Sequence, residues 1–248
     1  MKKFINYAHR GASSYAPENT MSAFELAIKQ GANGIELDLR KTKDKKIVIF
    51  HDEKIDNKSN SKGKLKNYTY EELCDIDFGS WFDKKYKGEP IVLFEDFAKK
   101  FLKKKITFAI ELKETGYEEK VLEIIKKYSN TENIYISSFK FKTLKNIRKL
   151  DKNIKISWLI KEKITKRNIR KLLKINGNEI CPKAIHTTHE DINIATTYGI
   201  QVRLWGIKDE EIMKEAYELN AVGMTVNFPD KLKKYMENKN IWYTNICE

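Results

Sequence analysis

Residues 34–39 read Gly-Ile-Glu-Leu-Asp-Leu, a run in which apolar and acidic side chains alternate. In a β-strand, alternate side chains point to the same face, so Glu36 and Asp38 project together and their apolar neighbours project to the other face. One alternative is that the two acids face solvent on an edge strand. The other is that they line a functional site, where a cation compensates their charge. The apolar face would suit covering helices, and this favours the site.

Short apolar runs recur along the chain, and most are separated by segments with helical periodicity. The candidate strands are residues 4–8, 34–39, 47–50, 106–112, 134–138, 156–160, 184–187, 202–205 and 222–226. A first helix is capped by Asn19 or Thr20 and ended by Gly31, and later helices are expected at 94–104, 117–128, 141–150, 165–173, 191–198, 210–219 and 230–237. This alternation predicts parallel strands with helices outside them.

The number of candidate strands exceeds by one the eight of a closed barrel. Residues 42–46 are too few for a parallel crossover, so 47–50 is predicted to fold back as a hairpin arm. The prediction is therefore a TIM-type (β/α)8 barrel that takes the whole chain, 1–248, as one domain, since no Pro/Gly/Ser linker divides it. The irregular, aromatic-rich segment at about 53–90 is expected to be an insertion after the His51 strand and a lid over the barrel mouth.

The composition indicates a globular protein with a well-solvated exterior, because 41% of the residues are hydrophobic and 33% are charged. The net charge of +13 comes mainly from dispersed lysines. No stretch combines a basic patch with arginine forks and stacking aromatics, so we expect no nucleic-acid partner. The positive field should favour anionic substrates.

The cysteines Cys74, Cys181 and Cys247 are odd in number and have no CxxC spacing, so neither a disulfide framework nor a zinc site is expected. A reducing compartment fits them, and we expect a cytoplasmic location. The start Met1-Lys2-Lys3 resembles a secretory signal, but Asn6 interrupts the apolar segment behind it. Apolar runs elsewhere are only a few residues long, so stable membrane insertion is not expected. Oligomeric state is left open.

Two histidines, His9 and His51, each follow a strand-like run and stand beside a charged residue. Imidazole titrates unassisted near neutral pH, so the pair suits general acid and base catalysis. For His9 alone, a core histidine bonded to a backbone carbonyl would be the simpler interpretation. His186 and His189 form a competing pair, but they have no carboxylates at ligand spacing and are less favoured.

The charged residues complete the groups needed for phosphodiester chemistry. Glu36, Asp38 and Glu111 are expected to converge as an oxygen-rich shell for one divalent ion, Mg²⁺ or Ca²⁺. Arg10 offers a planar fork to phosphate, and Lys113 offers a point charge. A base, an acid, fixed positive charge and a hard metal ion are what cleavage of a phosphodiester requires.

These residues stand in motifs that have a fixed order. The motifs are His9-Arg10-Gly11, Pro17-Glu18-Asn19-Thr20, Ile35-Glu36-Leu37-Asp38, Thr42-Lys43-Asp44, His51-Asp52, Glu111-Leu112-Lys113, Ser138-Phe139, Trp205 and Phe228-Pro229-Asp230. The whole set closely resembles the glycerophosphodiester phosphodiesterase family. The resemblance covers nearly the entire chain and implies a TIM-type barrel, a metal held by the three carboxylates, and acid and base roles for the two histidines.

The resemblance further implies phosphate contacts from Arg10 and Lys113 and a glycerol pocket walled by Trp205, which the residues alone would place in the core. Glu18 and Asp52 are expected to contact these groups and not the substrate. Departures from the family pattern are Gly206-Ile207-Lys208 after Trp205, where Thr-Val-Asn is usual, Val226 where threonine is common, and Asn57 where arginine is usual in the insertion. None of them removes a charged catalytic group, but Asn57 leaves headgroup contacts open.

The expected activity is metal-dependent hydrolysis of small glycerophosphodiesters to sn-glycerol 3-phosphate and an alcohol. By similarity to bacterial phosphatidylinositol-specific phospholipases C, His9 is assigned as base and His51 as acid, while direct attack by water stays open. One alternative is a lysophospholipase D-type activity, with insertion aromatics forming an apolar groove. A second is a phosphoglycerol-binding protein without catalysis, which is disfavoured because every histidine and metal ligand is present.

Overall fold

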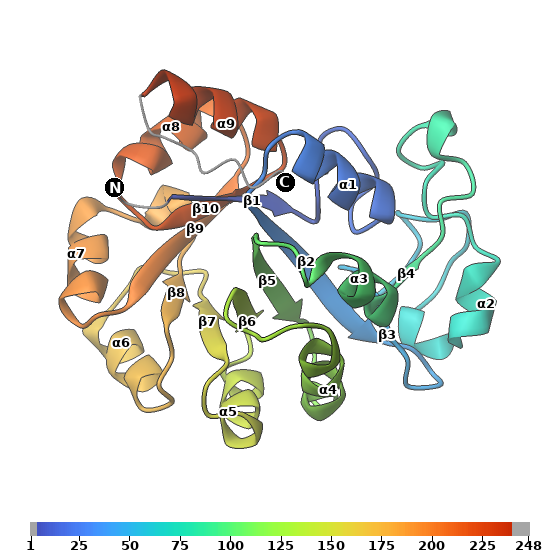
Figure 1. The fold of residues 1–248 in the computed structure, drawn as a ribbon, viewed down its shortest axis with the longest axis horizontal. Coiled ribbons are helices and arrows are strands. Elements are labelled where there is room, and N and C mark those ends of the chain that lie inside the picture. Colours follow the sequence, from blue (N-terminus) through green and yellow to red (C-terminus); the bar gives the residue numbers. More distant parts are fainter. Residues whose placement is uncertain (1–3, 240–248) are drawn as a thin grey trace.

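Eight parallel strands close into a barrel in the computed structural model, which describes residues 4–239. The barrel strands are β1 (Ile5–His9), β2 (Gly34–Lys41), β5 (Thr107–Leu112), β6 (Ile134–Ser138), β7 (Lys155–Leu159), β8 (Glu179–Cys181), β9 (Gln201–Ile207) and β10 (Gly223–Val226). Pairing of β1 with both β10 and β2 closes the ring (Figure 1). The predicted TIM-type barrel is confirmed.

Helices cover the outside of the barrel between successive strands (Figure 1). They are α1 (Met21–Lys29), α3 (Phe94–Phe101), α4 (Glu118–Tyr128), α5 (Phe141–Leu150), α6 (Lys166–Leu173), α7 (His189–Thr197), α8 (Glu210–Glu218) and α9 (Pro229–Asn238). The Thr20 hydroxyl accepts from the backbone N–H of Ala23 and caps α1, so of the two caps expected from the sequence Thr20 is the one used.

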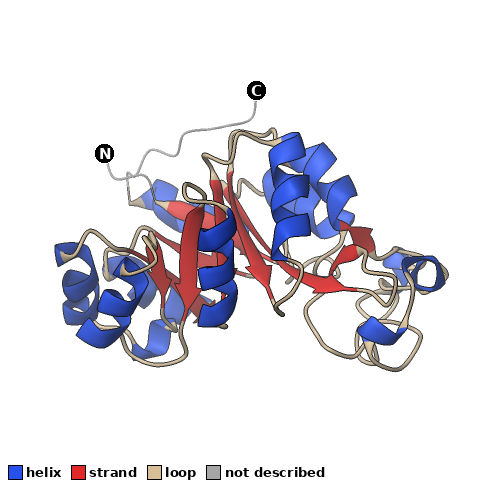
Figure 2. Ribbon diagram, turned by 90° about the horizontal axis from the view of Figure 1, so that it is seen from below, coloured by secondary structure: helices blue, strands red, loops and turns tan. Residues whose placement is uncertain are grey.

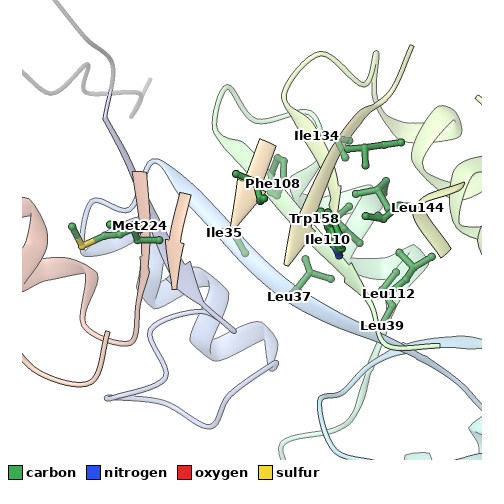
Figure 3. Packing of buried hydrophobic residues seen from close by; sticks show 14 of the residues in the cluster. Ile35, Leu37, Leu39, Phe108, Ile110, Leu112, Ile134, Leu144, Trp158 and Met224 are labelled. Carbon is green, nitrogen blue, oxygen red and sulfur yellow. The ribbon is translucent and has the colours of Figure 1, made fainter. Parts of the chain in front are cut away.

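The main core lies between the strands and these helices. Outward residues of β2 and β5, among them Ile35, Leu37 and Ile110, are fully buried there (Figure 3). Helix residues such as Phe97 and Leu144 cover them. The acidic residues that alternate with this apolar set on β2 therefore point into the barrel, as the alternation predicts.

The barrel interior is polar, with a buried ion pair at its centre. Arg203 on β9 and Glu179 on β8 are each 1% exposed, and the Arg203 Nε lies 3.0 Å from a Glu179 oxygen. The same oxygen accepts from the Ser157 hydroxyl at 2.6 Å. The Tyr7 ring lies beneath the guanidinium, with 4.9 Å from its centroid to Cζ.

We expect Arg203→Met alone to destabilise the fold by about 3–5 kcal/mol, because it strands Glu179 as an unpaired buried charge. Adding Glu179→Gln should recover most of that loss, since the double variant contains no buried charge at this position. Urea unfolding of both variants measures the difference. Equal loss in the single and double variants would contradict this account.

The hairpin predicted for residues 47–50 is present. β3 (Ile47–Ile49) pairs antiparallel with β2, and the short β4 (Val92–Leu93) adds to its other edge. Between them lies the insertion, which contains α2 (Tyr70–Cys74) and the short 3₁₀ helices η1 (Leu65–Asn67) and η2 (Lys84–Tyr86).

The insertion has a small core of its own, in which Ile55, Leu65, Leu73 and Phe78 pack against Val48 of the hairpin. This packing ties it to the hairpin side. It therefore lies beside the barrel and not across its mouth, where a lid was expected (Figures 1 and 2).

One predicted strand is wrong. Residues 184–187 begin with the 3₁₀ helix η3 (Ala184–His186), and the barrel strand lies earlier, at Glu179–Cys181. That strand has a buried glutamate and only three residues, so it lacks the apolar run by which strands are recognised. His186 and His189 are both exposed beyond it.

Two further expectations concern the cysteines and membrane insertion. Cys74 and Cys181 are free thiols, whereas Met1-Lys2-Lys3 and Cys247 lie outside the described residues. Within residues 4–239, no helix combines the length and the apolar character that crossing a bilayer requires.

Candidate active site

A tight turn after β1 places His9 and Arg10 at the barrel mouth. Arg10 and Gly11 both have positive φ, 56° and 83°. A side chain at position 11 would bring its Cβ to 2.6 Å from the Ala23 carbonyl carbon, so only glycine fits between the turn and α1. The backbone N–H of Arg10 donates to the Glu36 carbonyl at 2.9 Å, which joins the turn to β2.

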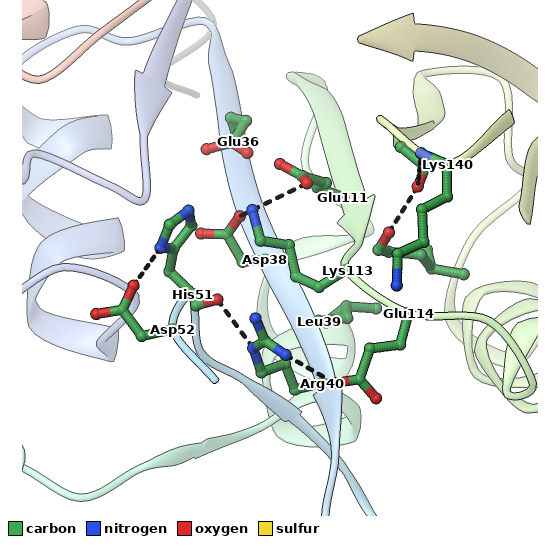
Figure 4. A network of polar contacts seen from close by, with 12 residues as sticks. Glu36, Asp38, Leu39, Arg40, His51, Asp52, Glu111, Lys113, Glu114 and Lys140 are labelled. Atoms are coloured by element: carbon green, nitrogen blue, oxygen red, sulfur yellow. Dashed lines mark hydrogen bonds and ion pairs between the residues drawn. The ribbon is translucent and has the colours of Figure 1, made fainter. Parts of the chain in front are cut away.

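Three carboxylates converge at the carboxyl ends of β2 and β5. Asp38 and Glu111 are register partners on neighbouring strands, and Glu36 precedes Asp38 on the same face. One oxygen atom of each lies within 4.8 Å of those of the other two, and all three residues are buried (Figure 4). The structure therefore brings together the three predicted metal ligands.

Two cations hold the central carboxylate. The Lys113 Nζ lies 3.1 Å from Asp38 and 2.9 Å from Glu111, and the Arg10 Nε lies 3.1 Å from the other Asp38 oxygen. Glu18 in turn receives a 2.9 Å hydrogen bond from Arg10. Both cations line the same pocket as Glu36 and Glu111.

The charges of the three carboxylates and the two cations show whether a metal ion would fit this cluster. Burial, and then the neighbouring Asp38, raise the pKa of Glu36 to about 8 and that of Glu111 to about 7. Lys113 and Arg10 outweigh burial at Asp38 and hold its pKa well below the usual range. When ionised, the three carboxylates carry one more negative charge than Arg10 and Lys113 offset, and the raised pKa values mean that protons compensate it. A divalent ion would take the place of these protons.

We therefore expect divalent-ion affinity to rise between about pH 6 and pH 8, because protons compete for Glu36 and Glu111 below their raised pKa values. Ion binding should release protons in this range and release few above it. Calorimetric titration with Ca²⁺ in two buffers of different ionisation enthalpy measures this release. Affinity that does not change with pH would contradict the three-carboxylate site.

The His9 ring has a neutral partner. Its Nδ1 lies 2.7 Å from the amide oxygen of Asn227, and because that oxygen can only accept, Nδ1 carries the proton. Nε2 then has a free lone pair, 3.9 Å from Glu36. Burial, followed by the nearby Arg10, lowers the pKa of His9 to about 3. His9 is thus held neutral, as a proton acceptor.

The His51 ring has a charged partner. Its Nδ1 lies 2.6 Å from an Asp52 oxygen, and this carboxylate favours the protonated imidazole (Figure 4). Burial is the largest effect and lowers the pKa of His51, while Asp38 and Asp52 oppose it. Arg40 fixes the backbone here by donating from Nε to the His51 carbonyl at 2.9 Å.

A pocket of about 240 Å³ collects these groups. His9, Arg10, Glu36, His51, Glu111 and Lys113 line it, and Phe139, Leu159, Trp205, Ile207 and Lys208 form the opposite wall. The Trp205 Nε1 donates to the carbonyls of Ile160 and Cys181, so its indole is fixed at the wall. The pocket lining includes no residue from 53–90, nor His186 or His189.

A family model for glycerophosphoryl diester phosphodiesterases matches residues 9–231. The chain belongs to the glycerophosphoryl diester phosphodiesterase family. A relative named glycerophosphodiester phosphodiesterase from Caldanaerobacter subterraneus is 31% identical over 93% of this chain and 96% of its own length. A relative of the same name from Bacillus altitudinis is 32% identical, and the match covers 93% of this chain and 97% of that protein. The predicted family and the predicted enzyme class, a phosphoric diester hydrolase, are confirmed.

Solved structures share the fold. A glycerophosphodiester phosphodiesterase from Thermotoga maritima is 26% identical with a TM-score of 0.76, and the match covers 93% of this chain and 98% of that one. An Oleispira antarctica phosphodiesterase, solved with the product sn-glycerol-3-phosphate, has a TM-score of 0.84 at 23% identity. The match covers 93% of this chain and 96% of that one. The second likeness bears on the fold alone.

Sequence reasoning missed two residues of this family member's site. Asn227 orients His9, and Asn19 donates to Asp38 at 2.9 Å with a positive φ of 61°. Asn19 stands inside a motif noted for the family, so its place there was a signal, but it suggested only a helix cap. Asn227 follows β10 directly, and a polar residue at the carboxyl end of a barrel strand is a general pointer to the site.

Proposed function

We propose that this chain hydrolyses glycerophosphodiesters to sn-glycerol 3-phosphate and a free alcohol. The observation that carries the proposal is one pocket lined by two differently partnered histidines, two cations and the carboxylates Glu36 and Glu111, with the third carboxylate, Asp38, buried beside them. The names of the relatives with more than 30% identity support the same substrate class. Arg10 and Lys113 supply the positive charge that a phosphate group requires.

In the first step, His9 Nε2 accepts the proton of the glycerol 2-hydroxyl, whose oxygen attacks phosphorus. His51 gives a proton to the departing alcohol oxygen as the P–O bond breaks. The products of this step are the alcohol and a cyclic glycerol phosphate. The neutral partner of His9 and the carboxylate partner of His51 support this assignment of base and acid.

In the second step the two histidines exchange roles. His51, now neutral, takes a proton from water as the water oxygen attacks phosphorus. His9 returns its proton to the 2-oxygen as the ring opens. Each histidine regains its starting state, and sn-glycerol 3-phosphate leaves.

Glu36, Asp38 and Glu111 would hold one divalent ion, Mg²⁺ or Ca²⁺. When bound, such an ion neutralises charge on the phosphate oxygens and lowers the pKa of the attacking hydroxyl. The convergence of the three buried carboxylates, with one oxygen of each within 4.8 Å of the others, is the feature of the chain that supports this ion.

The proposal is tested by incubating purified protein with glycerophosphocholine and Mg²⁺ or Ca²⁺ and identifying the products by ³¹P NMR. Glycerol 3-phosphate and choline are expected. A matched substrate that lacks the 2-hydroxyl tests the cyclic route, since it should not be cleaved. Its cleavage would indicate direct attack by water. A lysophospholipid arm tests the lysophospholipase D-type alternative, and no turnover of any substrate would contradict the enzymatic proposal.

We expect kcat/KM to vary only modestly among choline, ethanolamine and glycerol headgroups. The insertion, residues 53–90, does not line the pocket, so it does not enclose the alcohol end of the substrate there. A loosely enclosed alcohol contributes little to transition-state binding, so changing it should have a small effect. Competition assays with the three substrates measure the ratios. A preference of about 10³-fold or more would contradict this view.

Removal of the phosphate contact gives a matched comparison. Arg10→Ala should lower kcat/KM for all three substrates by the same factor, because the phosphate is common to them. Lys62→Ala, in the insertion, is the control and should leave all three unchanged.

A further inference from the structure

Arg203 is a buried cation that the proposed mechanism does not use. It lies two residues before Trp205 on β9, on the same inward face of the barrel, and is 1% exposed. It also lines the pocket that holds the two histidines. A fully buried arginine at a pocket floor has few hydrogen-bond partners to choose from, so its nitrogen atoms can be accounted for one by one.

Two of the three guanidinium nitrogens are occupied. Nε donates to Glu179 at 3.0 Å, and Nη1 donates to the Thr225 hydroxyl at 2.9 Å. Nη2 is buried and has no hydrogen-bond partner within the described chain. An arginine amino group carries two N–H donors, and leaving both unmade in a protein interior is unfavourable.

The positions of the partners indicate which end of the guanidinium lies toward the pocket. Thr225, which holds the Nη1 end, lines the pocket, whereas Glu179, which holds the Nε end, does not. The strands β8, β9 and β10 that carry these three residues are neighbours in the barrel wall (Figure 1). The end of the guanidinium that carries Nη1 and Nη2 therefore lies toward the pocket, and the Tyr7 ring centroid lies 4.9 Å from Cζ.

The chemistry of this donor differs from that of Arg10 and Lys113. Those two cations lie against the carboxylate cluster, on the β1, β2 and β5 side of the pocket. Arg203 lies on β9, and Glu179 already neutralises its charge. A neutralised guanidinium provides directional N–H donors with little net field, which suits an uncharged hydroxyl better than a phosphate.

We propose that Arg203 is a specificity-determining residue whose Nη2 donates to a free hydroxyl of the substrate's glycerol unit. This inference rests on the proposed function and adds a donor at the pocket floor to the indole wall of Trp205. Glu179 serves as the positioning residue that holds the guanidinium in place. A substrate without that hydroxyl leaves the buried donors unpaired, so the site discriminates against it.

Direct binding tests this without depending on turnover. Calorimetry in the presence of Mg²⁺ compares sn-glycerol 3-phosphate with 1-propyl phosphate, which has the same phosphate and carbon chain but no free hydroxyl. Wild-type protein should prefer glycerol 3-phosphate by about tenfold or more. Equal affinities would overturn the inference, while hydrolysis assays of glycerophosphocholine test the proposed function separately.

The key variant is Arg203→Met combined with Glu179→Gln, which removes the donor and leaves no stranded charge. It should bind glycerol 3-phosphate about tenfold or more weakly and bind 1-propyl phosphate as wild type does. If the affinities for both ligands fall equally, Arg203 contacts the phosphate or supports the fold. If neither affinity changes, Arg203 contacts no part of the ligand. Either result overturns the proposal.

Two further variants guard against a merely structural effect. Ser157→Ala removes a hydrogen bond to Glu179 but does not touch the pocket, so it should retain the wild-type preference. If the double variant does not fold, Arg203→Lys replaces it. The lysine can keep the ion pair with Glu179 but has no fork to reach the ligand as well, so it should lose the preference. Wild-type preference in a folded Arg203→Lys protein would contradict the inference.

Discussion

Replacement of either His9 or His51 by alanine should lower kcat by at least about 10²-fold, the usual contribution of a general acid or base. The two losses have different causes. His9→Ala removes the lone pair that accepts the hydroxyl proton, whereas His51→Ala removes the proton donor to the leaving alcohol. Steady-state assays with glycerophosphocholine measure both effects.

The chemical roles can be separated by the leaving group. A substrate with an acidic leaving group, such as a p-nitrophenyl ester of glycerol phosphate, needs little protonation. His51→Ala should therefore recover much of its rate on this substrate, and His9→Ala should not. Recovery by His9→Ala in place of His51→Ala would reverse the assignment of acid and base.

Exposed histidines provide the control. His186→Ala and His189→Ala lie outside the pocket and should retain wild-type turnover. Circular dichroism should show the same fold in all four variants, because His9 and His51 line the pocket and do not fill the apolar core. Wild-type turnover in His9→Ala or His51→Ala would remove that histidine from the mechanism.

The barrel could be predicted from the sequence because its strands are apolar on the face that meets the helices. Ile35, Leu37 and Leu39 show this on β2, and the acids between them show which face is inside. β8 could not be found in this way. Its inward residue Glu179 is charged, and its stability within the barrel depends on Arg203, which is distant in sequence.

The residues of the candidate site could be predicted where they lie at the ends of strands. His9, Asp38 and Glu111 stand at or near the carboxyl ends of parallel strands, and such ends meet at one edge of a barrel. The partners of these residues depend on three-dimensional packing. No local pattern brings Asn227 to His9, since His9 ends β1 and Asn227 follows β10, and the adjacency of these two strands follows only from closure of the barrel.

For the insertion, the sequence predicted the character of the segment but not its place beside the barrel. Its aromatic residues correctly indicated a segment with some packing of its own, and Phe78 does join a small core with Phe50. Its direction from the barrel is decided by the hairpin that carries it. β3 pairs along β2 and leads the chain outward, so Phe78 packs on the hairpin, while Tyr86 donates to the Tyr15 carbonyl in the loop after β1. None of the aromatics of the insertion lines the pocket.

Glu111→Gln should weaken divalent-ion affinity by at least about tenfold and raise the ion concentration needed for turnover by a similar factor. The amide keeps the shape of the side chain but removes one of the three negative charges that hold the ion. It also removes the ion-pair partner 2.9 Å from Lys113 and leaves this cation to Asp38 alone, which further lowers the negative charge available. Calcium titration by calorimetry and an activity curve against metal concentration measure the two effects.

Glu118→Gln is the matched control, because Glu118 is also buried but lies on α4, where it accepts from Asn146. Chelation should abolish wild-type activity, and added Mg²⁺ or Ca²⁺ should restore it. Wild-type metal dependence in Glu111→Gln would contradict the three-carboxylate site even if both histidine predictions held, because the acid and base could then act without an ion at this place.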